Sequence, residues 1–347
     1  MPFSLKPLSN QVIVITGATS GHGLCTAQMA AAAGAKVMLA ARDESALRRV
    51  RDEIRASGGT AEYVVTDTGI EAEVNHLAAE TIARFGGFDT WVNNAGIGVY
   101  ARILELAIDD HRKVFETNYW GMVHGSMAAV RYLKDQDGGA VINVGSINSD
   151  MGGPLLAAYN ASKHAVKGFT NSLRIEMMMS RYPVSVTLIK PSAIGTPFTE
   201  HGRNTTGYQA RLPRPIYAPD VVAKAILDAA QHRRRAVTVG GGGKFQVLGA
   251  VMLPSLFDRI AVKMADALID RNTPVEAVEG NLYQPQGNDG QTEGRQRGRR
   301  FSSFTAARRH GWMTAGAIAA LGTAGALILR RRSNTRSLSA PRRSGAA

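Results

Sequence analysis

The sequence has 347 residues, of which 44% are hydrophobic and 20% charged, and its formal net charge is +13. This length allows one large domain with additional segments, and the hydrophobic fraction is sufficient for a substantial core. The one cysteine excludes an intramolecular disulfide and any multi-cysteine metal site, and we expect no metal. Residues 291–347 hold 12 arginines and one acidic residue, a net charge of +11, which leaves +2 for residues 1–290. Any argument for nucleic-acid binding therefore concerns the tail alone.

Short β-branched runs alternate with longer helical patterns along most of the chain. The expected strands are Val12–Thr16, Lys36–Ala40, Ala61–Thr66, Thr90–Asn93, Ala140–Ser146, Val184–Lys190 and Ala236–Val239. The expected helices are Gly23–Ala33, Asp43–Ala56, Glu71–Phe85, Asp109–Leu133, Ala157–Arg181 and Pro219–His232. This alternation predicts βαβ units and an α/β, doubly wound parallel sheet of the Rossmann type. Ligands of such sheets bind beyond the carboxyl ends of the strands.

The first expected strand runs into a glycine-rich turn, "TGATSGHG", which contains Gly17, Gly21 and Gly23. Glycines without a Cβ let a ligand approach the backbone closely. The amino terminus of the following helix would present its N–H groups to a diphosphate. The spacing G-x-x-x-G-x-G differs from the usual G-x-G-x-x-G, so the turn by itself indicates a phosphate site only moderately. For His22, inside the turn, we expect a packing or solvent-facing role rather than catalysis.

Two further motifs follow the later strands. The segment "NNAG", Asn93 to Gly96, suits a backbone that lines a cofactor cleft, although an ordinary turn remains the alternative. Ser146 ends a strand, and "YNASK" places Tyr159 and Lys163 four residues apart, on one helix face. An ammonium near a tyrosine favours the phenolate and lowers its pKa, as a general acid/base requires.

Together these motifs resemble the classical short-chain dehydrogenase/reductase family over residues 10 to 240. The turn matches at Thr16–Gly23, "NNAG" at Asn93–Gly96, and the Ser and Tyr-x-x-x-Lys elements at Ser146, Tyr159 and Lys163. Asn118 in "TNYWG" matches the fourth catalytic position of the family. The Pro-Gly segment appears as "KPSAIGT", in which Ser192 replaces the glycine. The chain also carries a C-terminal hydrophobic extension outside the resemblance.

The resemblance implies a role for each matched position. Tyr159 would be the proton donor and acceptor, Lys163 would lower its pKa and hold the nicotinamide ribose, Ser146 would orient the carbonyl, and Asn118 would hold a water that relays protons. The cofactor contacts that it implies are at Gly17, Thr19, Ser20, Gly21, His22, Gly23, Arg42, Asp67, Asn94, Ala95, Gly96, Tyr159, Lys163, Pro191, Ile194 and Thr196.

The choice of cofactor is read at the end of the second expected strand, in "VMLAARDE". An acidic residue there would bind the ribose of NAD, whereas an arginine accommodates the 2′-phosphate of NADP. Alanines occupy the strand end and Arg42 follows them, so NADP(H) is expected in preference to NAD(H). Asp43 comes one residue later and is expected to be the N-cap of the next helix.

The part after residue 195 carries fewer motifs. We expect Gly195–Ala218 to be a lid, with a plain surface loop as the alternative. Residues 1–270 should form the catalytic domain, followed by a polar, Arg-rich linker over 271–310 and a basic tail over 330–347. The apolar segment Phe245–Leu268 could cover the substrate, pack on a partner subunit or touch a membrane. Residues 311–329 are uncharged and flanked by arginines, which predicts a membrane-associated or transmembrane helix. Because residues 1–10 lack an apolar segment, we expect the catalytic domain to face the cytoplasm.

These observations predict an NADP(H)-dependent oxidoreductase that interconverts a ketone or aldehyde and an alcohol, with a lipophilic substrate. The alternative is a nucleotide-binding scaffold or redox sensor without significant turnover. A nucleic-acid partner is not expected, because the apolar 19-residue segment lies within the arginine-rich tail. By resemblance, a homodimer or homotetramer would pair through Asp109–Leu133 and Ala157–Arg181.

Overall fold

The computed structural model describes residues 3–287 and 290–309. The chain divides into two units, Met1–Thr305 and Ala306–Ala347, and the fold described below is that of the first unit. The predicted helix over residues 311–329 lies outside the described residues. Among the residues that are described, no helix has both the length and the apolar character to cross a bilayer.

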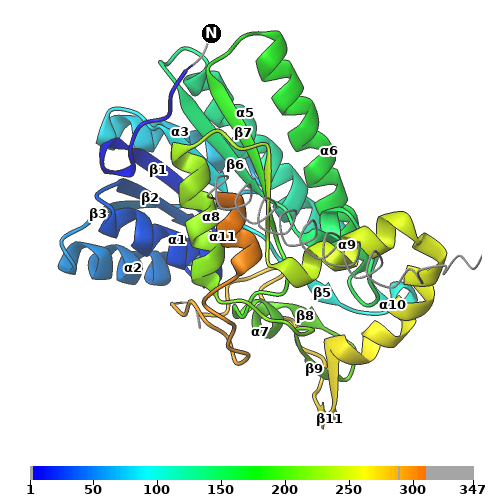
Figure 1. The fold of residues 1–347 in the computed structure, drawn as a ribbon. Coiled ribbons are helices and arrows are strands. Elements are labelled where there is room, and N and C mark those ends of the chain that lie inside the picture. Colours follow the sequence, from blue (N-terminus) through cyan, green and yellow to red (C-terminus); the bar gives the residue numbers. More distant parts are fainter. Residues whose placement is uncertain (1–2, 288–289, 310–347) are drawn as a thin grey trace, which may run out of the picture. The chain divides into compact units, whose positions relative to one another are not determined.

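A parallel sheet of seven strands forms the centre of the first unit, in the order β10-β7-β6-β4-β1-β2-β3 (Figure 1). These strands are β1 (Val12–Thr16), β2 (Lys36–Ala41), β3 (Thr60–Val65), β4 (Thr90–Asn93), β6 (Gly139–Val144), β7 (Val184–Pro191) and β10 (Ala236–Val239). The register pairs Val14 of β1 with Met38 of β2 and with Trp91 of β4. All three side chains are fully buried, as expected for strands covered on both faces.

Helices cover both faces of the sheet. One face carries α1 (Gly21–Ala32), α2 (Glu44–Ala56) and α8 (Pro219–Gln231), which Figure 1 shows in front of the strands. Their apolar residues, including Leu24, Leu47 and Ile226, share a core cluster with the sheet. The other face carries α3 (Glu71–Phe85), α5 (Gly121–Leu133) and α6 (Ala157–Met179), which contribute Leu77, Leu133 and Leu173 to a second cluster.

The strand order reverses between β1 and β4, because β2 and β3 continue to one side of β1 while β6, β7 and β10 continue to the other. In a doubly wound sheet, the crevice at such a reversal is where ligands bind, beyond the carboxyl ends of the strands. The glycine turn and the segment after Asn93 both begin at this edge. The fold predicted from the sequence is therefore confirmed, and it brings these two motifs side by side.

The predicted helix over 109–133 is divided in the structure. It consists of α4 (Ile108–Phe115), a π-helical turn over Glu116–Trp120, and α5. Single π-helical turns inside α-helices frequently occur at functional sites. Here the turn contains Asn118, which is 1% exposed.

The predicted lid over Gly195–Ala218 contains short regular elements: α7 (Phe198–His201), β8 (Arg203–Asn204) and β9 (Tyr208–Ala210). Strand β8 pairs with β5 (Val99–Tyr100), and β9 pairs with β11 (Ile269–Pro274). Two helices, α9 (Gly241–Met252) and α10 (Pro254–Leu268), lie between β10 and β11, and α11 (Ser303–Arg309) ends the described chain.

The segment after residue 270 differs from the predicted linker. Residues up to Thr305 belong to the same compact unit as the sheet. Their polar composition is compatible with this packing because several contacts are made by backbone groups, such as Arg299 N–H to the Ile216 carbonyl at 2.9 Å. The boundary expected at residue 270 therefore does not separate two units.

Candidate active site

The glycine turn has a backbone that only glycine adopts readily. Gly17 and Gly21 have φ angles of 65° and 55°, in the left-handed region. A Cβ on Gly23 would lie 2.1 Å from the carbonyl oxygen of Gly17 and 2.4 Å from Nδ2 of Asn94. Glycine at Gly23 therefore lets the turn pack tightly against Asn94, and Gly17 and Gly21 line a cavity at the amino terminus of α1, a position that suits the phosphates of a dinucleotide.

The "NNAG" segment joins this turn to the neighbouring strands. Asn94 Nδ2 donates to the carbonyls of Thr16 at 2.8 Å and Gly17 at 3.1 Å, and the Thr16 hydroxyl accepts from the backbone N–H groups of Asn94 and Ala95. Asn93 Nδ2 donates to Oδ1 of Asn143 on β6 at 2.8 Å. These amides hold β1, β4 and β6 together at the edge where the cleft opens.

His22 contacts the same amide network. Its Nδ1 lies 2.6 Å from Oδ1 of Asn94. Burial lowers the pKa of His22 to about 4, and the hydrogen bond to Asn94 offsets only part of this effect. The imidazole is therefore neutral at physiological pH and donates from Nδ1. This geometry matches the packing role expected for His22.

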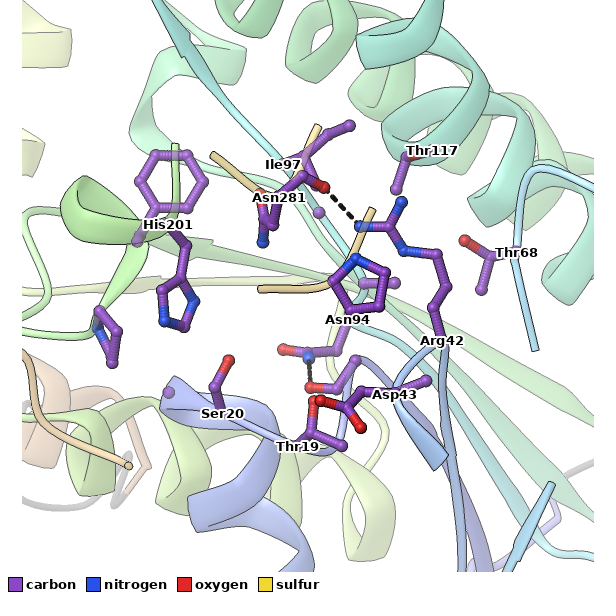
Figure 2. Close-up of a pocket in the computed structure, with 18 of the residues that line it drawn as sticks. Thr19, Ser20, Arg42, Asp43, Thr68, Asn94, Ile97, Thr117, His201 and Asn281 are labelled. Atoms are coloured by element: carbon purple, nitrogen blue, oxygen red, sulfur yellow. Dashed lines mark hydrogen bonds between the residues drawn. The ribbon is translucent and has the colours of Figure 1, made fainter. Parts of the chain in front are cut away.

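The first cavity, which we call the cofactor cleft, extends from the glycine turn to the end of β2 (Figure 2). Its lining includes predicted cofactor residues from the segments that follow β1, β2, β3, β4 and β7: Gly17, Thr19, Ser20, Gly21, His22, Arg42, Asp67, Asn94, Ala95, Gly96 and Thr196. Asp43 accepts a hydrogen bond from the N–H of Ala46 at 3.0 Å, which confirms it as the N-cap of α2. The polar, glycine-lined cleft therefore fits a dinucleotide.

The second cavity, which we call the substrate pocket, adjoins the cleft. Ser146, Tyr159 and Lys163 line it together with Pro191 and Ile194, which were predicted as cofactor contacts. The remaining lining is largely apolar and comes from segments far apart in the sequence: Tyr100, Ile147, Met151, Leu156, Phe198, Leu212, Pro213, Met264 and Leu268. The predicted lid thus contributes Phe198, Leu212 and Pro213.

The four predicted catalytic residues come from three elements near the end of β6. Ser146 is 7% exposed and begins a short 3-10 turn, where its Oγ accepts from the N–H of Asn148 at 3.1 Å. Lys163 is 4% exposed and donates from Nζ to the carbonyl of Val144 at 2.9 Å. Its ammonium lies 5.6 Å from the ring centre of Tyr159, four residues earlier on α6.

Asn118 is tied to the cofactor cleft by both ends of its amide. Its Oδ1 accepts from the N–H of Ile97 at 2.8 Å, and its Nδ2 donates to the carbonyl of Ile97 and to Oγ of Ser162, each at 3.0 Å. These bonds fix the π-helical turn against the segment after "NNAG". Asn118 therefore reaches α6 one residue before Lys163.

The pKa of Tyr159 differs from the prediction made from the sequence. Burial raises the pKa of Tyr159, and a hydrogen bond with Ser146 offsets part of this shift. Burial also lowers the pKa of Lys163 to about 8. The predicted lowering of the Tyr159 pKa is therefore not found, because desolvation outweighs the stabilisation of the phenolate.

Ser192, which stands where the resemblance has glycine, packs on Gly240. Its Oγ is buried without a hydrogen-bond partner, and a Cβ on Gly240 would lie 2.1 Å from it. The Ser192 side chain, which replaces the glycine of the Pro-Gly segment, therefore fits only because the facing residue, Gly240, has no side chain.

Sequence reasoning missed several cleft residues, among them Thr68, Ile97, Thr117 and His201, and a group late in the chain. Asn281, Pro285 and Gln286 line the cofactor cleft, although they lie in the predicted linker. Leu282 is 0% exposed and packs with Ile97 and Val99. In the sequence, only the two adjacent hydrophobic residues Leu282 and Tyr283, within an otherwise polar segment, could have indicated that this part of the chain packs on the fold.

A doubly wound sheet with a dinucleotide cleft and a Ser–Tyr–Lys group at its carboxyl edge defines an oxidoreductase of the Rossmann type. The sequence pattern described as "short chain dehydrogenase" matches residues 11–207. The chain therefore belongs to the short-chain dehydrogenase/reductase family, and it is an oxidoreductase of that family, whose members bind nicotinamide dinucleotides.

Three known proteins illustrate this similarity. The "Uncharacterized oxidoreductase YxnA" of Bacillus subtilis (strain 168) is 44% identical over 75% of this chain and 74% of its own length. "Dehydrogenase/reductase SDR family member 7B" of Mus musculus is 38% identical over 54% of this chain and 59% of its own length. A crystal structure of a short chain dehydrogenase/reductase from Burkholderia phymatum in complex with NAD has a TM-score of 0.66 at 27% identity, covering 73% of this chain and 96% of that one.

Proposed function

We propose that this chain interconverts a lipophilic ketone or aldehyde and the corresponding alcohol with NADP(H), with Tyr159 as the acid/base. The observation that carries the proposal is the placement of Ser146, Tyr159 and Lys163 around one largely apolar pocket that adjoins the cofactor cleft. A carbonyl carbon in this pocket would face the cleft while its oxygen meets hydroxyl groups. The bound cofactor would supply the hydride chemistry.

The side chains divide the proton chemistry among them. In reduction, the Tyr159 hydroxyl donates its proton to the carbonyl oxygen, and Ser146 donates a hydrogen bond to the same oxygen. The raised pKa of Tyr159 keeps this hydroxyl protonated at neutral pH. Lys163, whose pKa of about 8 makes it mostly charged at neutral pH, would stabilise the developing phenolate. Asn118 would hold the relay water beside Lys163.

Arg42 supports the preference for NADP(H). It follows β2, lines the cofactor cleft and carries a positive charge where the 2′-phosphate of the adenosine ribose would lie. The neighbouring carboxylate, Asp43, accepts from Ser45 Oγ at 2.7 Å and from the N–H of Ala46, so it is engaged in capping α2. Charge-assisted hydrogen bonds from a guanidinium to a phosphate would favour NADP(H) over NAD(H).

The lipophilic substrate is supported by the helices that cover the pocket. Met264 and Leu268 line its interior, while Phe245, Val251 and Val262 of α9 and α10 are 76%, 63% and 75% exposed. Exposed apolar patches of this kind mark interaction or membrane sites. Together with the apolar segment at residues 311–329, they favour a membrane-associated enzyme whose catalytic domain faces the cytoplasm.

The proposed homodimer or homotetramer has support in the exposed apolar side chains of the helices expected to pair. Trp120, Ile175 and Met178 are 49%, 62% and 71% exposed. An Ile175→Glu substitution should reduce the molar mass measured by light scattering to that of the monomer, whereas Ile103→Glu, on an exposed turn outside these helices, should leave it unchanged.

The test is an assay of the full-length protein in detergent, with NADPH and NADH, against carbonyl compounds of increasing apolar area. The proposal expects NADPH-dependent turnover whose kcat/KM rises with apolar area. Tight NADPH binding without turnover on any compound of the panel would contradict the proposal and favour the scaffold or sensor.

A further inference from the structure

A polar segment after β11 crosses the cofactor cleft. We call it the C-terminal strap and define it as residues 278–287 and 290–299. Its two ends pair with the lid segment: Val278 exchanges backbone hydrogen bonds with Asn204 at 2.8 and 2.9 Å, and Arg299 N–H donates to the Ile216 carbonyl at 2.9 Å. Between them, Gly294 N–H donates to the Gly195 carbonyl at 3.0 Å. The strap is therefore tied to the lid at both ends.

The middle of the strap contacts the parts of the cleft that would hold phosphates. Gly21 N–H, at the start of α1, donates to the Gln291 carbonyl at 2.9 Å, and Gly290 N–H donates to the Thr19 carbonyl at 2.8 Å. The strap thus forms a two-way backbone pair with the glycine turn. The Gly21 N–H is therefore occupied by the strap, and a diphosphate can accept from it only when this pair opens.

The other end of the cleft is joined to the strap through Arg42. Its guanidinium donates to the backbone carbonyls of Asn281 at 2.5 Å and Tyr283 at 3.1 Å. Figure 2 shows Arg42 and Asn281 side by side in the cleft, joined by a hydrogen bond. Backbone carbonyls orient the guanidinium without neutralising its charge, which leaves it suited to a phosphate.

Two neighbouring side chains anchor the strap here. Leu282 is fully buried with Ile97 and Val99, next to the "NNAG" segment. The Tyr283 hydroxyl donates to Oδ1 of Asp110 on α4 at 2.8 Å. Asn281, Pro285 and Gln286 are thereby held as one wall of the cleft.

We propose that the C-terminal strap is part of the dinucleotide site: it encloses the adenosine half of the cofactor, and cofactor entry and release require the strap to open. The two described parts of the strap contact the cleft at its two ends, 290–299 at the glycine turn and 278–287 at Arg42, so a dinucleotide that fills the cleft lies against both. Local opening of a segment held mainly by backbone pairs is a low-cost motion compared with global unfolding. The preference for NADP(H) in this inference rests on the proposed function, whereas the enclosure does not.

The test measures cofactor exchange with the full-length protein by stopped-flow fluorescence, using NADPH and NADH in separate arms. In the wild type, the observed association rate should level off at high cofactor concentration, because strap opening limits entry. Hydrogen exchange of the Gly290 and Asn281 amides should slow when NADPH is bound.

Two independent variants loosen the strap. Leu282→Ala with Tyr283→Phe removes both anchors, and Gly290→Ala strains a residue with φ of 112° that pairs with the turn. Matched controls are Leu104→Ala with Tyr182→Phe, at exposed positions, and Gly58→Ala, a left-handed glycine with open space around it. Both strap variants should accelerate cofactor dissociation at least about tenfold, while the controls stay within about twofold.

An association rate that rises linearly with concentration, together with unchanged dissociation in both strap variants, would overturn the strap. The two cofactor arms separate the two proposals. Faster release of both cofactors, with NADH bound more tightly than NADPH in the wild type, would support the strap and contradict the NADP(H) preference. If the wild type binds NADPH more tightly than NADH but neither strap variant changes cofactor release, the result would support the NADP(H) preference and contradict the strap proposal.

Discussion

The cofactor cleft and the substrate pocket adjoin each other and share His22, Asn94, Gly96, Thr196 and Phe198, yet they are built differently. The cleft consists largely of backbone at strand ends, shaped by glycines and fixed by buried amides. The pocket is a set of apolar side chains from loops and helices as far apart as Tyr100 and Leu268. A site built from backbone can be recognised in short sequence motifs, whereas a site built from side chains depends on how distant segments pack. Substitutions on the two sides should therefore separate cofactor binding from substrate binding.

The largest effect is expected at Gly23. Gly23→Ala would place a Cβ 2.1 Å from the Gly17 carbonyl oxygen, so the turn must shift and cofactor binding should fall below detection by fluorescence titration. Gly168→Ala is the control, because the space around Gly168 on α6 is open. It should raise the free energy of unfolding by roughly 0.5–1 kcal/mol and leave cofactor binding unchanged. Normal NADPH binding by Gly23→Ala would contradict this account of the turn.

A substitution in the substrate pocket should change substrate binding and leave cofactor binding unchanged. Leu212→Glu replaces an apolar pocket residue with a charged one, so KM for a lipophilic carbonyl should rise roughly 10- to 100-fold, the range expected for losing one buried apolar contact. The Kd of NADPH should stay unchanged. Equal losses in both constants would show that the two cavities are not separable in this way.

At the adenosine end, Arg42→Ala should weaken NADPH binding roughly 10- to 100-fold, the equivalent of one or two charge-assisted hydrogen bonds. NADH, which lacks the 2′-phosphate, should lose clearly less affinity than NADPH, because for NADH only the contact of Arg42 with the strap is removed. Isothermal titration with both cofactors measures the difference. A similar loss for NADH would mean that Arg42 acts on the strap rather than on the phosphate.

The smallest effect, up to about tenfold for the first pH unit above 8, is expected in the pH dependence of the wild type. The pKa of Lys163 is lowered to about 8, so its charge is present below that pH and lost above it. The pKa of Tyr159 is raised, so its proton remains in place through this range. The kcat/KM for carbonyl reduction should therefore be level up to about pH 8 and fall by up to about tenfold per unit above it. A profile that stays level to pH 10 would contradict this assignment.

The same division explains what the sequence could predict. The seven strands of the sheet, the glycine turn and the meeting of "NNAG" with it follow from local patterns, because parallel strands present their carboxyl ends at one edge. The π-helical turn at Asn118 and the C-terminal strap do not, since each depends on contacts between segments distant in sequence, such as Asn118 with Ile97 and Arg42 with Asn281. The raised pKa of Tyr159 likewise reflects desolvation, which sequence spacing cannot report.

The central claim is that Tyr159 performs the proton transfer in an NADP(H)-dependent carbonyl reduction. The most direct measurement compares Tyr159→Phe with Tyr100→Phe, which removes another buried phenol from the same pocket. With a carbonyl that the wild type reduces, Tyr159→Phe should lower kcat by about 10³-fold while NADPH binding is retained. Tyr100→Phe should stay within a few fold of the wild type. Unchanged turnover in Tyr159→Phe would contradict the account.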